Sequence, residues 1–205
     1  MIVTISREYG AAARAVSQGA AERLGYRLLD DDLPVVVAAH LGTSPEVIES
    51  VEHRRPGLAE RLLRSLNAAV PELSQPVLHH DDIDEDAVRE IERQVRAAAA
   101  GGDVVIVGRI AGSILGPGPE TLRVFLQAPL PWRIAHVVDS LGVSPAEARE
   151  EIDRIDRGRH AYAEERYGIV LGDPTHYDLV IDVSRFGIDG TADLIASAVT
   201  RHLHA

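Results

Sequence analysis

IVTISREYGAAAR, residues 2–14, runs from a β-branched segment through a loop of small residues into the start of a helix. A strand that feeds such a loop brings successive backbone amides and the N-terminus of the following helix to one place, where they can bind an anion. The helix is expected from Arg14 to Leu24, because apolar residues recur at helical spacing and Gly25 follows the last turn. The segment therefore predicts a strand, a candidate phosphate loop and a helix.

The loop differs from the standard phosphate-binding pattern G-x-x-x-x-G-K-[ST], whose glycines permit close approach and whose lysine reaches the terminal phosphates. Gly10 is present, but alanines occupy the places of the second glycine and the lysine, and no hydroxyl follows for magnesium. Taken alone, the loop fits either a phosphate site or an ordinary turn between a strand and a helix.

Other β-branched runs alternate with helical patterns along the chain. Strands are expected at 2–5, 26–29, 104–107, 122–126 and 179–182. Several of them are nearly continuous apolar runs, which suit a sheet covered on both faces. A helix start is predicted where the chain reads SPAE at 144–147, a capping serine followed by proline and, three residues on, glutamate. The alternation predicts an α/β domain with a mainly parallel sheet, whose ligands bind beyond the carboxyl ends of the strands.

The composition is that of one globular domain. The 205 residues are 45% hydrophobic and 26% charged, which fits a single domain over 1–205 and excludes a disordered or collagen-like chain. A formal net charge of −11 opposes attraction to nucleic acid and to anionic membranes, so we expect neither as a partner. The absence of cysteine excludes disulfides and thiolate metal sites. With no signal peptide and no apolar run approaching ~18 residues, the expectation is a cytoplasmic protein.

The region 43–101 is rich in charge and in helical patterns, and we interpret it as a helical insertion. It carries leucines at helical spacing that could pack on the domain or pair with a second copy, so that a homodimer through the insertion is one expectation. These leucines are Leu58, Leu62, Leu63 and Leu66. The run HHDD at 79–82 suggests a metal site, but its aspartates better fit the N-terminus of a helix running through Ala100, where the helix dipole favours them. No metal ligand is assigned.

Several segments, taken in order, resemble the cytidylate kinase-like family, a branch of the nucleoside monophosphate kinases. They read ISREYG at 5–10, AERLGYRLLD at 21–30, VGR at 107–109, LRVFLQAP at 122–129, WR at 132–133, DRIDRGR at 153–159 and GDPTHYDL at 172–179. The likeness covers nearly the whole chain and is weakest over 43–101. The ordered series is specific, whereas no single member of it would be.

The resemblance implies a three-layer P-loop kinase fold with a five-stranded sheet and an arginine-bearing lid over 144–172. It implies a phosphotransferase that moves the γ-phosphoryl group of ATP to a nucleoside monophosphate or a similar small acceptor, with magnesium carried mainly by the nucleotide. The catalytic residues that it implies in the lid are Arg154, Arg157 and Arg159. The implied donor-phosphate residues are Arg7, Gly10, Ala11, Ala12, Ala13 and Arg14. The implied acceptor residues are Asp30 and Arg109.

The chain also departs from the family, whose members commonly carry G-S-G-G-R in the first loop. Ala11–Ala13 replace that serine and the glycines, and Arg7 and Arg14 are the nearest cations in place of a lysine. An alanine at a position of positive φ would cost about 1 kcal/mol or more. Aspartate follows the acceptor arginine in true cytidylate kinases, but Ile110 stands here, so a preference for cytosine does not follow. The alternative function is a catalytically weak or inactive protein that binds a nucleotide or another anion as a regulatory module.

Overall fold

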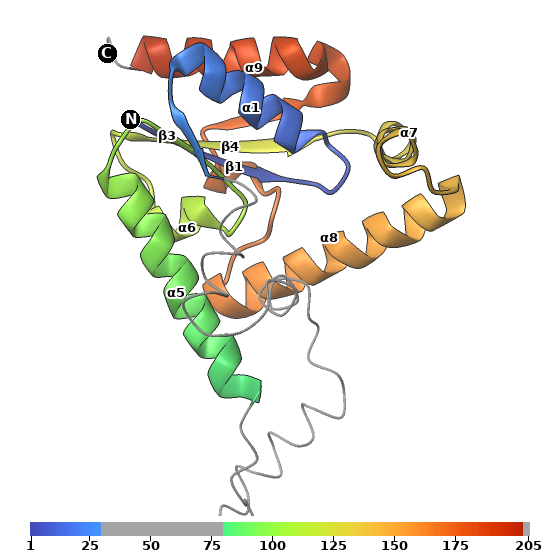
Figure 1. Cartoon of the computed structure of the whole chain (residues 1–205), viewed down its shortest axis with the longest axis horizontal. Helices are drawn as coiled ribbons and strands as arrows, with labels where there is room; N and C mark the ends of the chain where they lie inside the picture. The colour runs from blue at the N-terminus through green and yellow to red at the C-terminus, as the bar shows by residue number, and fades with distance from the viewer. Residues whose placement is uncertain (30–79, 203–205) are drawn as a thin grey trace, which may run out of the picture.

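The computed structural model describes residues 1–29 and 80–202, which form a sheet between layers of helices (Figure 1). The strands are β1 (Ile2–Arg7), β2 (Arg27–Leu29), β3 (Val104–Val107), β4 (Thr121–Gln127) and β5 (Leu179–Asp182). Their order across the sheet is β2-β3-β1-β4-β5, and every neighbouring pair is parallel. The five predicted strands and the mainly parallel sheet are confirmed.

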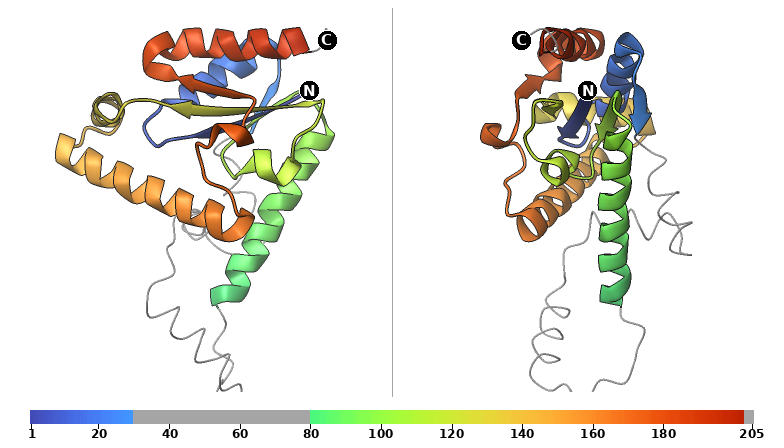
Figure 2. Two further views of the ribbon diagram at one scale, coloured as in Figure 1. Left: turned by 180° about the vertical axis from the view of Figure 1, so that it is seen from behind. Right: turned by 90° about the vertical axis from the view of Figure 1, so that its left-hand side faces the viewer.

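Helices cover both faces of this sheet. They are α1 (Ala13–Leu24), α5 (His80–Ala100), α6 (Ala111–Leu115), α7 (Leu130–Leu141), α8 (Pro145–Tyr167) and α9 (Val183–His202), with a 3₁₀ helix, η2, at Pro174–His176. Figures 1 and 2 show α1 and α9 together on one face and α5 and α6 on the other, with α7 and α8 extending beyond the carboxyl end of β4. Within the described ranges, no helix has the length and apolar character needed to cross a lipid bilayer.

Strand β3 shows why the sequence gives three layers. All four of its residues are buried, because alternate side chains point to opposite faces and each face meets a helical layer. Val105 belongs to the cluster formed with α1 and α9, which includes Val16 and Ile195. Its neighbours Val104 and Ile106 belong to the other cluster, with α5 and α6. A nearly continuous run of β-branched residues is therefore what a strand in the middle layer requires.

Helix α5 joins the predicted insertion to the core. It begins at His80, so the acidic run forms its first turns instead of preceding it, and it ends at Ala100 as predicted. Its buried face packs with β3 and α6, and consists of Val88, Ile91 and Val95. The predicted leucines between 58 and 66, and Asp30, lie outside the described residues.

Helix α8, within the predicted lid, is fixed at both ends. At its start Ser144 forms the predicted capping box: the Glu147 amide donates to Ser144 Oγ at 3.3 Å, and the Ser144 amide donates to Glu147 Oε2 at 2.8 Å. At its end the Tyr167 hydroxyl donates to Glu92 Oε1 on α5 at 3.0 Å. Burial is the main cause that raises the pKa of Tyr167, so this hydroxyl remains a donor at neutral pH. The helix therefore spans from α7 to α5.

Candidate functional site

The first loop follows the carboxyl end of β1 and is packed closely against α7. Gly10 has φ 83°, in the left-handed region that favours glycine. A Cβ at Gly10 would lie 3.1 Å from the Cβ and backbone oxygen of Arg133 and 3.1 Å from Val137 Cγ2. Gly10 is therefore required both by the backbone conformation and by the close approach of α7.

The three alanines after Gly10 turn the loop into α1. Ala11 and Ala13 are buried in the core cluster beneath α1 and α9. Ala12 is the N-cap of α1, with φ 53° and ψ 29°, and makes no side-chain capping hydrogen bond. Because alanine offers no side-chain acceptor, the first-turn amides of α1 are not satisfied by the cap residue. They can instead face an anion, as expected for a helix N-terminus next to a phosphate.

Ala12→Gly is expected to change the free energy of unfolding by less than about 0.5 kcal/mol, because relief of the left-handed alanine offsets both the loss of a buried methyl and the added entropy of the unfolded chain. Urea denaturation measures the change. Ala11→Gly is the matched control: Ala11 is 1% exposed, and losing its buried methyl should lower stability by about 1 kcal/mol. Equal destabilisation by both changes would contradict the strain assigned to Ala12.

A cavity of about 140 Å³ opens beside this loop and the N-terminus of α1. Its lining comes from β1, the loop, α1, β3 and α8, and consists of Arg7, Glu8, Tyr9, Gly10, Ala13, Arg14, Val107 and Arg159. Three of these side chains are arginines, so the cavity combines a helix N-terminus with a local excess of positive charge in an acidic protein. That combination suits a polyphosphate.

A second, smaller cavity of about 30 Å³ adjoins the carboxyl ends of β1 and β3. It is lined by Ser6, Arg7, Gly108, Arg109, Ile110, Arg159, Tyr162 and Leu171. Arg7 and Arg159 line both cavities, and Arg109 lines this one. The guanidinium groups thus gather where the strands end, which is where a doubly wound sheet binds ligands.

The turn after β3 has an unusual backbone. Gly108, Arg109 and Ile110 all have positive φ, at 73°, 56° and 50°. A β-branched residue rarely adopts this region, and strained residues of this kind cluster at binding sites. A Cβ on Gly108 would collide with Nη1 of Arg7, so the glycine leaves room for that guanidinium. The turn therefore accommodates Arg7 beside Gly108, and both Arg7 and Arg109 line the smaller cavity.

The three arginines of the predicted lid have different surroundings. Arg159 lies over the ring of Tyr9, with its Cζ 5.7 Å from the ring centroid. Arg154 is more exposed, and its Nη2 and Nε donate to Glu151 at 2.6 and 2.9 Å. Arg157 is exposed. Burial raises the pKa of Tyr9, as does Glu151, while Arg159 and Arg154 act in the opposite direction. The structure brings Arg159 to both cavities, together with Arg7, and brings Arg14 and Arg109 to one each.

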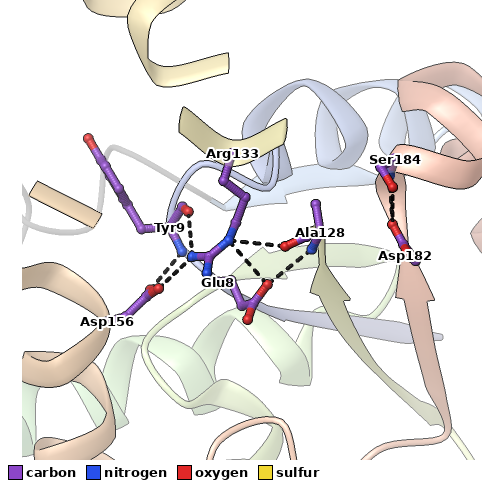
Figure 3. A network of polar contacts seen from close by, with 7 residues as sticks. All are labelled: Glu8, Tyr9, Ala128, Arg133, Asp156, Asp182 and Ser184. Carbon is purple, nitrogen blue, oxygen red and sulfur yellow. Dashed lines mark hydrogen bonds and ion pairs between the residues drawn. The ribbon is translucent and has the colours of Figure 1, made fainter. Parts of the chain in front are cut away.

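The sequence did not reveal the role of Arg133, which is 8% exposed on α7 and ties the loop to its neighbours (Figure 3). Its Nε donates to the Ala128 carbonyl at 3.1 Å, and its Nη1 donates to the Tyr9 carbonyl at 3.1 Å and to Asp156 Oδ2 at 2.6 Å. One available signal was its position one helical turn before the apolar Val137, which is also buried.

In the same figure Asp182 accepts from Ser184 where β5 turns into α9.

Known structures with the same arrangement include kinases. An uncharacterized protein from Eubacterium ventriosum superposes with a TM-score of 0.66 and 20% identity, over 98% of each chain. A shikimate kinase from Acinetobacter baumannii superposes with a TM-score of 0.50 and 13% identity, over 98% of this chain and 92% of the other. With the five-stranded parallel sheet, these likenesses confirm the predicted P-loop kinase fold.

The sequence comparisons identify the family. A cytidylate kinase from Methanopyrus kandleri is 34% identical over 136 residues, which are 62% of this chain and 68% of that protein. The model of the cytidylate kinase-like family matches residues 2–185, which include the residues that line both cavities and the whole of α8. The chain belongs to the cytidylate kinase-like family.

Proposed function

We propose that this chain is a nucleotide kinase that moves the γ-phosphoryl group of ATP to a nucleoside monophosphate or a similar small phosphorylated acceptor. The observation that carries the proposal is that two neighbouring cavities share the guanidinium groups of Arg7 and Arg159. The larger cavity, at the N-terminus of α1, would take the donor phosphates. The smaller one, with Arg109, would take the acceptor phosphate.

This arrangement fits what phosphoryl transfer demands of a protein. An oxygen of the acceptor phosphate attacks the γ-phosphorus, and the bond from that phosphorus to the bridging oxygen breaks, leaving ADP. The attacking oxygen is already ionised at neutral pH, so the step needs alignment and positive charge more than a general base. Arg7 and Arg159, shared by both cavities, would meet the charge on the transferred group.

The acceptor side is defined by a cation and an apolar wall. Arg109 can grip a phosphate through two parallel N–H groups. Ile110, which follows it, is 9% exposed and lines the same cavity, where it would contact the acceptor through its apolar surface. Asp30 remains a proposed acceptor contact.

Magnesium would be carried by the nucleotide. Over residues 1–29 and 80–202 there is no group of three or more histidine, aspartate or glutamate side chains able to hold a metal ion. Mg²⁺ commonly binds through substrate phosphates and water with one or two carboxylates, which is the basis for proposing that the ion arrives with ATP. Its role would be to neutralise the phosphates as the arginines align them.

A coupled assay with ATP and magnesium, run across nucleoside monophosphates and small phosphorylated acceptors, tests the proposal. We expect turnover with at least one acceptor. Arg109→Ala should raise the KM of that acceptor, because Arg109 lines the smaller cavity and not the larger one. The affinity for ATP, measured by calorimetry, should change little. Absence of turnover with every acceptor would count against the kinase.

The alternative is a nucleotide-binding regulatory protein without significant catalysis. The left-handed Ala12 favours it, because the alanine strains a loop that glycine would form freely. Tight ATP binding without turnover would support this alternative. If the protein neither binds ATP nor shows turnover, both the kinase and the nucleotide-binding regulatory protein are excluded.

A further inference from the structure

The carboxylate of Asp156 joins the lid helix to the first loop. Asp156 lies near the middle of α8, and its Oδ1 accepts the backbone N–H of Tyr9 at 2.8 Å. Its Oδ2 accepts from Arg133 Nη1 at 2.6 Å. The side chain is 19% exposed, so both contacts are largely shielded from water. Figure 3 shows Asp156 approaching the loop from α8 while Arg133 approaches from α7.

The two partners of Asp156, Tyr9 and Arg133, belong to a hydrogen-bonded unit at the ends of two strands. Arg133 contacts the carbonyls of Tyr9 and Ala128, which follow β1 and β4. Glu8 closes the unit: its Oε2 accepts the Ala128 amide at 3.0 Å and lies 3.4 Å from Arg133 Nε. Asp156 therefore attaches α8 to the carboxyl ends of the central strands, where both cavities lie.

Arg159 lies three residues after Asp156, about one helical turn further along α8 and on the same side of the helix. Its guanidinium stacks over Tyr9, the residue whose backbone amide Asp156 holds. One end of this turn is thus fixed to the Tyr9 backbone and the other to the Tyr9 ring. Because the helix is rigid between these points, a shift of Asp156 would move Arg159 relative to both cavities.

We propose that Asp156 is a positioning residue: it docks α8 on the first loop and so sets the place of Arg159 at the wall shared by the two cavities. Asp156 itself does not touch the reacting groups. The inference rests on the proposed function for its kinetic consequence, whereas the docking of α8 can be observed without turnover. A purely structural Asp156 would neutralise Arg133 without influencing Arg159.

A double-mutant cycle separates these two roles, with Asp156→Ala, Arg159→Ala and the double variant measured by coupled assay. Asp156→Ala should lower kcat about 30-fold, with a much smaller change in the KM for ATP, because a displacement near 1 Å can cost this much. In the Arg159→Ala background the same change should lower kcat by less than about threefold, since a residue that acts through Arg159 has nothing left to position. Equal effects in both backgrounds would overturn the proposal.

The control is Asp153→Ala, which removes an exposed aspartate from the preceding turn of α8 and should leave kcat within about twofold of the wild type. If Asp156→Ala does not fold, Asp156→Asn replaces it, because one of the two accepting oxygens becomes an NH2 group, which cannot accept from Tyr9 or from Arg133. A smaller loss of kcat in this variant, again absent without Arg159, is then the expected result.

Nuclear magnetic resonance gives a readout independent of activity. The Arg159 side-chain N–H signal should be shifted by the Tyr9 ring in the wild type and move toward the position for an exposed arginine in the Asp156 variant. Tyr9→Leu, which removes the ring, defines the unshifted position. An unmoved signal in the Asp156 variant would overturn the docking role, even if the kinase assay had failed for every acceptor.

Discussion

Arg159→Ala is expected to lower kcat about 10³-fold, with a folded protein and a largely unchanged affinity for ATP. Arg159 lines both cavities, so its guanidinium would contact the phosphoryl group during its passage from one to the other. Positive charge at that place stabilises the transition state more than the bound substrate, and its loss therefore appears in kcat. Steady-state kinetics with the best acceptor, together with calorimetry for ATP, measure the two quantities.

Arg154→Ala provides the comparison within the same lid. Arg154 pairs with Glu151 and is 56% exposed, so its removal should change kcat by less than about threefold. A 10³-fold loss in Arg154→Ala with little loss in Arg159→Ala would reverse this assignment. A large loss in both, and in Arg157→Ala, would mean that the lid acts through all the arginines that the family resemblance implied.

The sheet could be predicted from the sequence because local pattern and tertiary environment agree there. A strand such as β3 must be apolar on both sides, and its four consecutive β-branched residues satisfy that requirement at once. The start of α8 could be predicted for the same reason, since the capping box at Ser144 uses residues only three positions apart. The start of α5 could not, because its acidic run can either precede a helix or form its first turns.

Parts of the candidate site depend on contacts that local pattern does not contain. Arg133 and Asp156 are 23 residues apart and on different helices, so neither predicts the other. The left-handed Ala12, Arg109 and Ile110 are residue types that avoid positive φ, and their conformation is imposed by the packing around them. The run of arginines on α8 was visible in the sequence, but which arginine faces the cavities depends on how α8 is docked.

Arg133→Met should lower the free energy of unfolding by about 3 kcal/mol, because it leaves a partly buried carboxylate without its charged partner. Methionine fills much of the same space, but it cannot donate to the Ala128 and Tyr9 carbonyls or to Asp156. Urea denaturation of the wild type and the variant, at low and at high salt, measures the loss.

Arg23→Met is the matched control, because Arg23 also bridges two acidic side chains, Asp189 and Asp193 on α9, but does so in solvent. The charges of an exposed ion pair are well solvated whether or not they are paired, so Arg23→Met should lower the free energy of unfolding by only a small fraction of the Arg133→Met effect. This small loss should decrease further at high salt, which screens exposed charges. The Arg133 effect should persist at high salt, since ions screen a buried pair poorly. If the two variants lose equal stability, or if the Arg133 loss disappears in salt, then the Arg133–Asp156 pair does not hold α8 to the first loop.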